Sequence, residues 1–205
     1  MEMMQSLENM YGYNVPILLN EIDILGITEV NIRQVVKRLV DRGYLERFGQ
    51  GVYYIPKMTL LGKSLLSAKK VYEKKYIYDG SNVYGFYAGL TFENAIGITN
   101  QMPNVVEIVT NNECSRVREV MIGNQKVRLR KASVMVTDQN ARILQFLDFM
   151  NRINLKGMSA TSKGCLIAFV KNQNFKRDEV FLYISKYPSR TCKNMIESGV
   201  INEIT

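Results

Sequence analysis

The stretch TEVNIRQVVKRLVDRGYLERFGQGVYYIP, residues 28–56, decides the fold expected for the N-terminal part of this chain. Its first half places apolar residues at the three-and-four spacing of a helix buried along one side, namely Ile32, Val35, Val36, Leu39 and Val40. The opposite side carries groups that can hydrogen-bond a base edge or neutralise a phosphate: Asn31, Arg33, Gln34, Lys37, Arg38 and Arg42. Gly43 suits the left-handed conformation that ends helices, so we expect the helix to stop there.

A β-hairpin is expected directly after this helix. Residues 44–48 and 52–55 are short runs of strand-forming residues, and they are separated by Gly49-Gln50-Gly51. Pro56 ends the second strand because proline has no N–H to donate to a neighbouring strand. A polar-faced helix followed at once by a two-stranded ribbon is the plan of a winged helix-turn-helix. In that motif the helix enters the major groove of DNA and the ribbon lies along the backbone.

Two shorter helices are predicted before residue 28. Met3, Met4, Leu7 and Met10 have the spacing of a first helix. A second helix is predicted to start at an Asn14 cap with Pro16 in its first turn, and to end at Gly26; its buried face would be Ile17, Leu18, Ile22 and Leu25. We therefore expect a winged helix-turn-helix domain over residues 1–57, with the domain boundary between Lys57 and Gly62, where the composition changes.

The distribution of charge favours a polyanionic partner. The 205 residues carry a net charge of +8. Residues 1–30 hold five Asp and Glu and no Lys or Arg, whereas residues 31–75 hold eleven Lys and Arg against three acids. Basic charge thus begins at the predicted recognition helix, as contact with phosphates would require. Two alternatives stay open: some winged helices make only protein contacts, and Arg47 and Gln50 are equally well explained as solvated hairpin residues.

Residue usage excludes several classes of enzyme. Without histidine the chain cannot build Ser-His or Cys-His nucleophiles or the usual zinc sites. Cys114, Cys165 and Cys192 have no metal-binding spacing and are expected to be reduced thiols in a cytoplasmic protein. No apolar run approaches the roughly 18 residues of a membrane span, and the acidic N-terminus is unlike a signal peptide. We predict no catalytic residue, metal, cofactor or membrane partner.

Residues 58–205 are predicted to form a mixed α/β domain with a helical C-terminal cap. A buried strand is expected at 105–110, and a hairpin at 117–122 and 126–131. Helices are predicted after a Ser64 cap, at 91–98, from Asp138 to Ile153, after Thr161 or Ser162, at 178–187 and at 189–198. The expected fold class is therefore α+β.

The predicted hairpin carries alternating basic residues. Side chains on a strand alternate between its two faces, so pairing of the two strands would gather five cations on one face: Arg116, Arg118, Lys126, Arg128 and Arg130. Five like charges so close would repel one another unless they were screened or met by an acidic partner. The set is either an ordinary solvated sheet face or a docking surface for RNA, DNA or an acidic protein.

Two motifs of the chain resemble the AbiEi antitoxins of type IV toxin–antitoxin systems. One is the segment RFGQGVYYIP at residues 47–56. The other is Gly89-Leu90-Thr91 followed by AIGITNQMP at residues 95–103. The combination at this spacing is more specific than either motif alone, and the resemblance extends to Pro188-Ser189-Arg190.

The resemblance implies a function and a set of contact residues. It implies a winged helix that represses its own operon by binding inverted repeats in promoter DNA. It also implies a C-terminal domain that opposes a nucleotidyltransferase-like toxin in abortive phage infection, without requiring a stable complex. The matching DNA-contact positions here are Asn31, Arg33, Gln34, Lys37, Arg38, Arg47 and Gln50. The antitoxin surface proposed from charge alone is the five-cation set on the predicted hairpin.

Two other functions compete with this interpretation. A stand-alone regulator would sense a small molecule through an apolar pocket with a few polar groups within residues 84–160. A metal-dependent nuclease would need an acid on one strand and an acid-x-Lys on the next. The acid-x-Lys of this chain, Glu73-Lys74-Lys75, lies in a predicted helix before the sheet begins, which is the wrong geometry.

Overall fold

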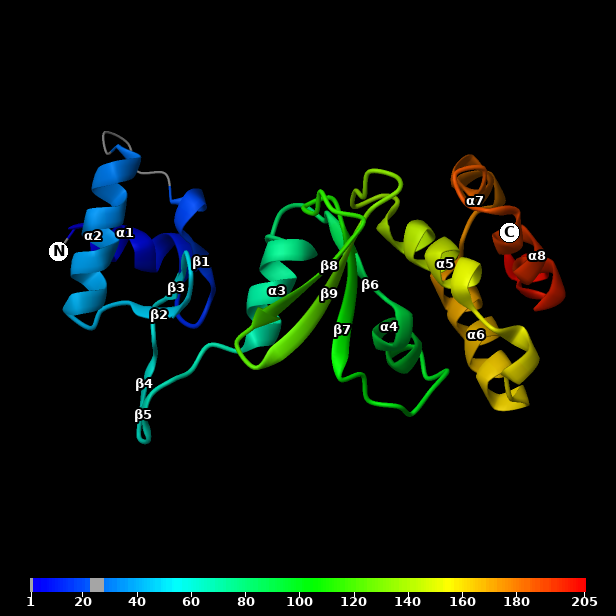
Figure 1. Cartoon of the computed structure of the whole chain (residues 1–205), viewed down its shortest axis with the longest axis horizontal. Helices are drawn as coiled ribbons and strands as arrows, with labels where there is room; N and C mark the ends of the chain where they lie inside the picture. The colour runs from blue at the N-terminus through cyan, green and yellow to red at the C-terminus, as the bar shows by residue number, and fades with distance from the viewer. Residues whose placement is uncertain (1, 23–27) are drawn as a thin grey trace. The chain divides into compact units, whose positions relative to one another are not determined.

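The computed structural model describes residues 2–22 and 28–205, with the side chains of residues 2, 3, 29 and 30 left out. Over these residues the chain is α+β, with eight α-helices and sheets of three, two and four strands (Figure 1). It divides into two compact units. Unit 1 is Met1–Lys74 with Ile122–Asn124, and unit 2 is Lys75–Met121 with Gln125–Thr205. The predicted α+β fold class is confirmed.

The first part of unit 1 contains two α-helices and a small antiparallel sheet. Its first elements are α1 (Glu2–Tyr11), β1 (Ile17–Leu18), the 3-10 turn η1 (Leu19–Glu21), α2 (Glu29–Asp41), β2 (Glu46–Gly49) and β3 (Val52–Tyr54). The strand order is β1-β3-β2. The core joins all of these elements through Leu7, Ile17, Ile22, Ile32, Val36, Leu39, Leu45 and Ile55. The first helix, the helix at 29–41 and the hairpin after it match the sequence-based predictions.

The second predicted helix, from Asn14, is wrong. Asn14 has a φ of 56° and donates its N–H to the carbonyl oxygen of Ile55, so it caps no helix. Ile17 instead pairs with Tyr53 as part of β1, and its side chain is fully buried. A two-stranded hairpin is marginal by itself, so a third strand on β3 outweighs helix formation here. Leu25 and Gly26 lie outside the described residues.

The connection from α2 into the hairpin follows the glycine pattern of the sequence. Gly43 has a φ of 75°, as expected for the residue that ends α2. Gly49 pairs with Val52, so the hairpin turn is the dipeptide Gln50-Gly51, with Gly51 at a φ of 67°. A shift in register between Arg47 and Gly49 marks a bulge in β2.

Unit 1 continues through a second hairpin and a helix: β4 (Met58–Thr59), β5 (Gly62–Lys63) and α3 (Ala68–Tyr76). This hairpin was not predicted, because strands of two residues show no hydrophobic period. The Ser64 cap is wrong: its hydroxyl accepts from the N–H of Lys57 and donates to Asn14 Oδ1. Lys74 Nζ donates to the carbonyl oxygen of Pro16 at 2.9 Å, so unit 1 extends beyond the predicted limit at residue 57.

Unit 2 is built on a mixed four-stranded sheet. Its strands are β6 (Gly85–Ala88), β7 (Val105–Thr110), β8 (Val117–Ile122) and β9 (Gln125–Lys131), in the order β6-β7-β9-β8. β7 is antiparallel to β6 and parallel to β9. The strand at 105–110 and the hairpin after it are confirmed, whereas β6 was not predicted. The short helix α4 (Gly89–Ala95) follows β6.

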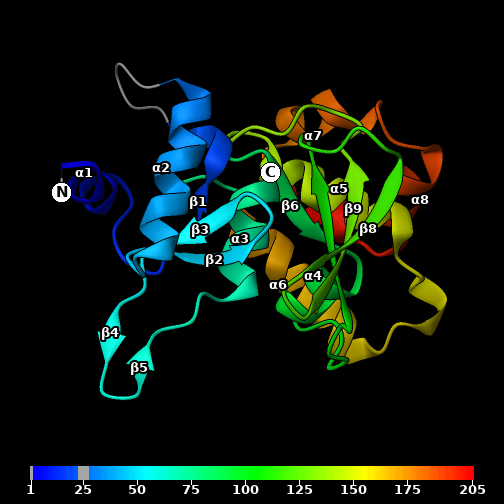
Figure 2. The same cartoon turned by 60° about the vertical axis from the view of Figure 1, so that its left-hand side comes forward.

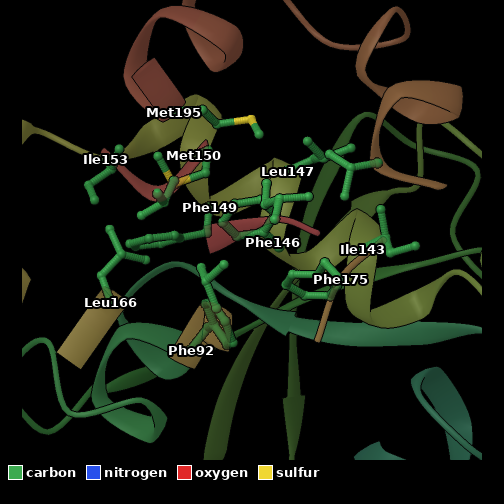
Figure 3. Packing of buried hydrophobic residues seen from close by; sticks show 14 residues of the cluster. Phe92, Ile143, Phe146, Leu147, Phe149, Met150, Ile153, Leu166, Phe175 and Met195 are labelled. Atoms are coloured by element: carbon green, nitrogen blue, oxygen red, sulfur yellow. The ribbon is translucent and has the colours of Figure 1, made fainter. Parts of the chain in front are cut away.

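The helical C-terminal part of unit 2 packs on an aromatic core. It consists of α5 (Ala141–Arg152), η2 (Leu155–Gly157), α6 (Ala160–Gln173), α7 (Arg177–Ile184), α8 (Ser189–Glu197) and η3 (Val200–Glu203). Phe92 meets Phe149 edge to face, and Phe146 stacks on Phe175 with ring centroids 5.1 Å apart (Figure 3). The predicted start of α6 at Thr161 or Ser162 is corrected, because the hydroxyl of Ser159 accepts from the N–H of Ser162 and caps the helix.

Replacing Gly85 by alanine is expected to lower the free energy of unfolding by about 2–3 kcal/mol, the cost of overpacking. A Cβ at this position would lie 1.9 Å from the carbonyl oxygen of Tyr76 and 2.8 Å from that of Val109, both backbone atoms. Gly164 in α6 is the matched control, because its Cβ would meet nothing within 4 Å. Gly164→Ala should raise the free energy by about 0.5–1 kcal/mol. Calorimetric unfolding of the two variants measures both effects, and equal shifts would contradict the packing of β6 against β7.

Candidate nucleic-acid interface

Burial divides α2 into an apolar side and a polar side. Ile32, Val36 and Leu39 are between 2% and 8% exposed and face the core of unit 1. The polar side chains predicted to contact DNA are all exposed: Asn31, Arg33, Gln34, Lys37 and Arg38, with Arg42 at the end of the helix. The structure therefore turns toward solvent the set of amides and cations that the periodicity places on one side.

Lys37 and Arg38 on this side of α2 are exposed to an external anion. Over the described part of the chain, none of the ion pairs involves Lys37 or Arg38. Asp41 is exposed near the end of the same helix and is the acid there. Cations without an ionic partner keep their full attraction for phosphate, since no charge has to be displaced when DNA binds.

The two predicted contacts on the hairpin are also exposed. Gln50 lies in the β2–β3 turn, where its side chain faces solvent. Arg47 lies on β2, and its Nε donates to the carbonyl oxygen of Gly49 at 3.3 Å. That hydrogen bond leaves the terminal guanidinium nitrogens of Arg47 free to reach a phosphate. Unit 1 thus contains all seven predicted contact residues, five on α2 and two on the hairpin.

The five predicted cations of unit 2 do not gather on one face. Glu119 of β8 bonds Lys126 at 2.5 Å and Arg128 at 2.8 Å, both on β9. Because strand side chains alternate, Arg118 points away from the face that Glu119 shares with these two cations. Arg118 instead bonds Glu113 at 2.9 Å, and Arg116 is exposed just before β8. The positions of the acids Glu119 and Glu113, rather than the alternation of the cations, determine which cations lie together.

Arg130 is a largely buried residue with a structural role. Its Nη1 and Nη2 bond the two carboxylate oxygens of Asp148 in α5 at 2.9 and 2.7 Å, and both side chains are 11% exposed. Tyr187 lies nearby; burial, with a contribution from the charge of Asp148, raises the pKa of its hydroxyl. This bidentate pair joins β9 to α5, so Arg130 is not available at a surface.

Glu113 is held ionised beside Arg118. Burial would raise the pKa of its carboxyl group, but the N–H of Ser115 and the charge of Arg118 outweigh burial and hold the pKa below its ordinary value. A group with a depressed pKa stabilises the fold above its unfolded pKa and loses that contribution as the pH falls through the folded value. The Glu113–Arg118 ion pair thus stabilises the start of β8 at neutral pH.

Three features of the described residues bear on metal binding, disulfides and membrane spans. Across residues 2–22 and 28–205, no three His, Cys, Asp or Glu side chains come together as metal ligands. The three cysteines are free thiols, as the sequence predicted. None of the helices in the described part of the chain has the length and apolar character needed to cross a bilayer.

Fold and surface together define an α+β protein with a solvent-facing helix of amides and cations in its N-terminal unit. The chain belongs to DUF6088, a family of unknown function, whose model matches residues 15–163. That match covers α2, both hairpins of unit 1 and the sheet of unit 2, and it ends within α6. A comparison with curated proteins finds no match.

Replacing Asp148 by asparagine is expected to lower the free energy of unfolding by about 3–5 kcal/mol, because it leaves the buried charge of Arg130 unpaired. Glu119→Gln is the control, since it removes an acid from an exposed ion-pair cluster and should change the free energy of unfolding little. A double variant with Arg130→Met and Asp148→Leu should recover most of the loss. Chemical denaturation followed by far-UV circular dichroism measures all three, and equal stability of the Asp148 and Glu119 variants would contradict burial of the pair.

Proposed function

We propose that this protein is a DNA-binding autorepressor and antitoxin of a type IV toxin–antitoxin operon. The observation that carries the DNA-binding part is the exposed polar side of α2, with Lys37 and Arg38 outside the ion pairs of the described residues. The proposal assigns no catalytic step to the chain.

The order of elements in unit 1 supports treating it as a winged helix-turn-helix. The helix α2 is followed after a short connection by the β2–β3 hairpin, and β1 adds a third strand to that hairpin. In the proposed complex α2 enters the major groove with Asn31, Gln34 and Arg38 toward base edges. Arg47 and Gln50 of the hairpin then approach the phosphate backbone.

The antitoxin part of the proposal rests on the resemblance to AbiEi antitoxins and on the exposed cations of unit 2. Arg116 is exposed, and Lys126 and Arg128 keep about half of their side-chain surface exposed while bonding Glu119. A nucleotidyltransferase-like toxin, or a nucleic acid that it acts on, would meet these residues. Arg130 is left out of this surface because it is buried against Asp148.

One observation bears on the second candidate, a ligand-sensing regulator. Unit 2 contains a cavity of about 250 Å³ lined by Phe86, Tyr87, Asp138, Arg142 and Gln145, among others. Ligand sites usually measure about 300–1,000 Å³, so this cavity suits only a small molecule. Gln145 also donates to the carbonyl oxygen of Tyr87 and is occupied within the protein. Unit 2 also contains cavities of about 460 and 360 Å³, which fall within the usual range of ligand sites, so the ligand-sensing regulator stays the second candidate.

The DNA-binding proposal is tested by salt titration of binding to a duplex taken from upstream of the protein's own reading frame. Binding should weaken steeply with salt, because each neutralised phosphate releases counterions. Lys37→Ala with Arg38→Ala should weaken binding roughly tenfold and reduce the slope of log affinity against log salt by about 2. Fluorescence anisotropy at several salt concentrations gives both values.

The matched control removes the same charge from unit 2. Lys163 and Lys186 are exposed and lie on or next to helices of the C-terminal part. Lys163→Ala with Lys186→Ala should leave affinity and salt slope nearly unchanged. A flat salt response of the wild type would contradict the electrostatic premise of the proposal. Equal losses in the two double variants would show that net charge rather than α2 accounts for binding.

The two proposed activities should separate. The Lys37→Ala, Arg38→Ala protein is expected to lose repression of its promoter and still protect cells from the toxin, because α2 lies in unit 1 and the exposed cations at the start of β8 and on β9 lie in unit 2. A reporter fusion measures repression, and growth during toxin expression measures protection. A folded double variant that loses both activities would contradict this division.

A further inference from the structure

The β4–β5 hairpin forms a projecting arm, which we call the 57–64 arm after its residues. Figure 1 and Figure 2 both show it extending from the body formed by α1, α2 and the β1-β3-β2 sheet. Two antiparallel pairs, Met58 with Lys63 and Thr59 with Gly62, hold its strands together. Thr59 Oγ1 also donates to the carbonyl oxygen of Gly62 and accepts from the N–H of Leu61, which closes the turn.

The base of the arm is fixed to unit 1. Lys63 Nζ donates to the carbonyl oxygen of Gly43 at 3.1 Å and bonds Glu46 Oε1 at 2.6 Å. Ser64 bonds both Lys57 and Asn14. These contacts join the arm to the end of α2 and the start of β2, so its direction is set by the same unit that presents the polar side of α2.

The tip of the arm is apolar and fully exposed. Leu60 and Leu61, the turn residues, are 107% and 100% exposed, and Met58 beside them is 69% exposed. Leucine gains from burial, and an ordered turn that holds two leucines in water forgoes that gain until a partner covers them. The tip is therefore an exposed apolar surface that burial against a partner would stabilise.

The charge of the surrounding sequence favours a polyanion as the partner of the tip. Residues 47–72 contain no Asp or Glu and five cations, namely Arg47, Lys57, Lys63, Lys69 and Lys70. A stretch with this excess of positive charge attracts a polyanion such as DNA. A second copy of the chain is a poorer fit, because three side chains bury on the order of 300 Å². A stable protein interface needs about 800 Å² from each partner.

We propose that the 57–64 arm is a second DNA contact, which inserts Leu60 and Leu61 between base pairs from the minor-groove side and bends the duplex. This inference rests on the proposed DNA-binding function and extends it. Apolar side chains such as leucine and methionine serve as wedges that unstack a base step, and the bend brings more backbone to the protein. Lys57, exposed at the base of the arm, would neutralise a phosphate that the bend draws in.

The test measures binding and bending with the full chain and the same upstream duplex, labelled with a donor and an acceptor dye at its two ends. Wild type should raise energy transfer on binding. Leu60→Ala with Leu61→Ala should bind about tenfold more weakly, a loss of about 1.4 kcal/mol, and should abolish the rise in energy transfer. Leu60→Met with Leu61→Met keeps an apolar tip and should retain both.

Leu65 provides a matched control, because it is 88% exposed in the same unit but lies just beyond the arm. Leu65→Ala should change affinity less than the double alanine variant and leave bending intact. Since all three leucines are exposed, none of the substitutions removes a core contact, and circular dichroism verifies folding.

The outcomes separate failure of the arm from failure of the proposed function. The arm proposal is wrong, and the DNA-binding function stands, if three results are found together. Wild type binds, Lys37→Ala with Arg38→Ala weakens binding, and Leu60→Ala with Leu61→Ala bends DNA like wild type. If wild type does not bind the duplex, both fall. The Leu60→Ala, Leu61→Ala variant is also compared with wild type in sedimentation and in binding to phosphatidylglycerol vesicles. If it loses a dimer or vesicle binding while bending is unchanged, the tip contacts another partner and the proposal is overturned.

Discussion

Burial of one side of α2 is the constraint from which the N-terminal unit follows. Ile32, Val36 and Leu39 can leave water only by packing on the core to which Leu7 and Ile17 also belong. Once they do, the helical period turns the intervening amides and cations outward. The same packing positions the end of α2, where Gly43 releases the chain into the β2–β3 hairpin. The exposed polar side of α2 and the core are thus two consequences of one periodic sequence.

Local pattern predicts this part of the chain well because each element is decided by its own residues. The helix at α2 and the strand at β7 have strong periods or apolar runs, and their limits match. At residues 14–22 the local pattern predicts the wrong element. Their apolar spacing suits a helix, yet Ile17 gains more by pairing with Tyr53, a residue 36 positions away that no local window contains. The 57–64 arm was not predicted for another reason. Its strands of two residues are too short to show a hydrophobic period, and the adjacent leucines before Gly62 are its one feature in the sequence.

Charge was the weaker guide in unit 2. Alternation along β9 correctly places Lys126 and Arg128 on one face, but it does not show which acids meet them. Glu119 lies on the neighbouring strand and takes both, while Arg130 finds Asp148 on a helix 18 residues later. A buried bidentate pair costs desolvation and fixes geometry, so Arg130 contributes to specifying how β9 docks on α5 rather than to a surface. A net charge of +8 therefore overstates what unit 2 offers to an anion.

The distinction that matters for function is between cations with partners and cations without. In α2, Lys37 and Arg38 are exposed and lie outside the ion pairs of the described residues. At the base of the arm, Lys63 is committed to the carbonyl oxygen of Gly43 and to Glu46. A cation at a helix C-terminus is favourable to the helix dipole, so Lys63 stabilises α2 while holding the arm. One lysine thereby ties the base of the arm to the end of the helix that carries the exposed Lys37 and Arg38, so the direction of the leucines depends on the same contacts that end α2.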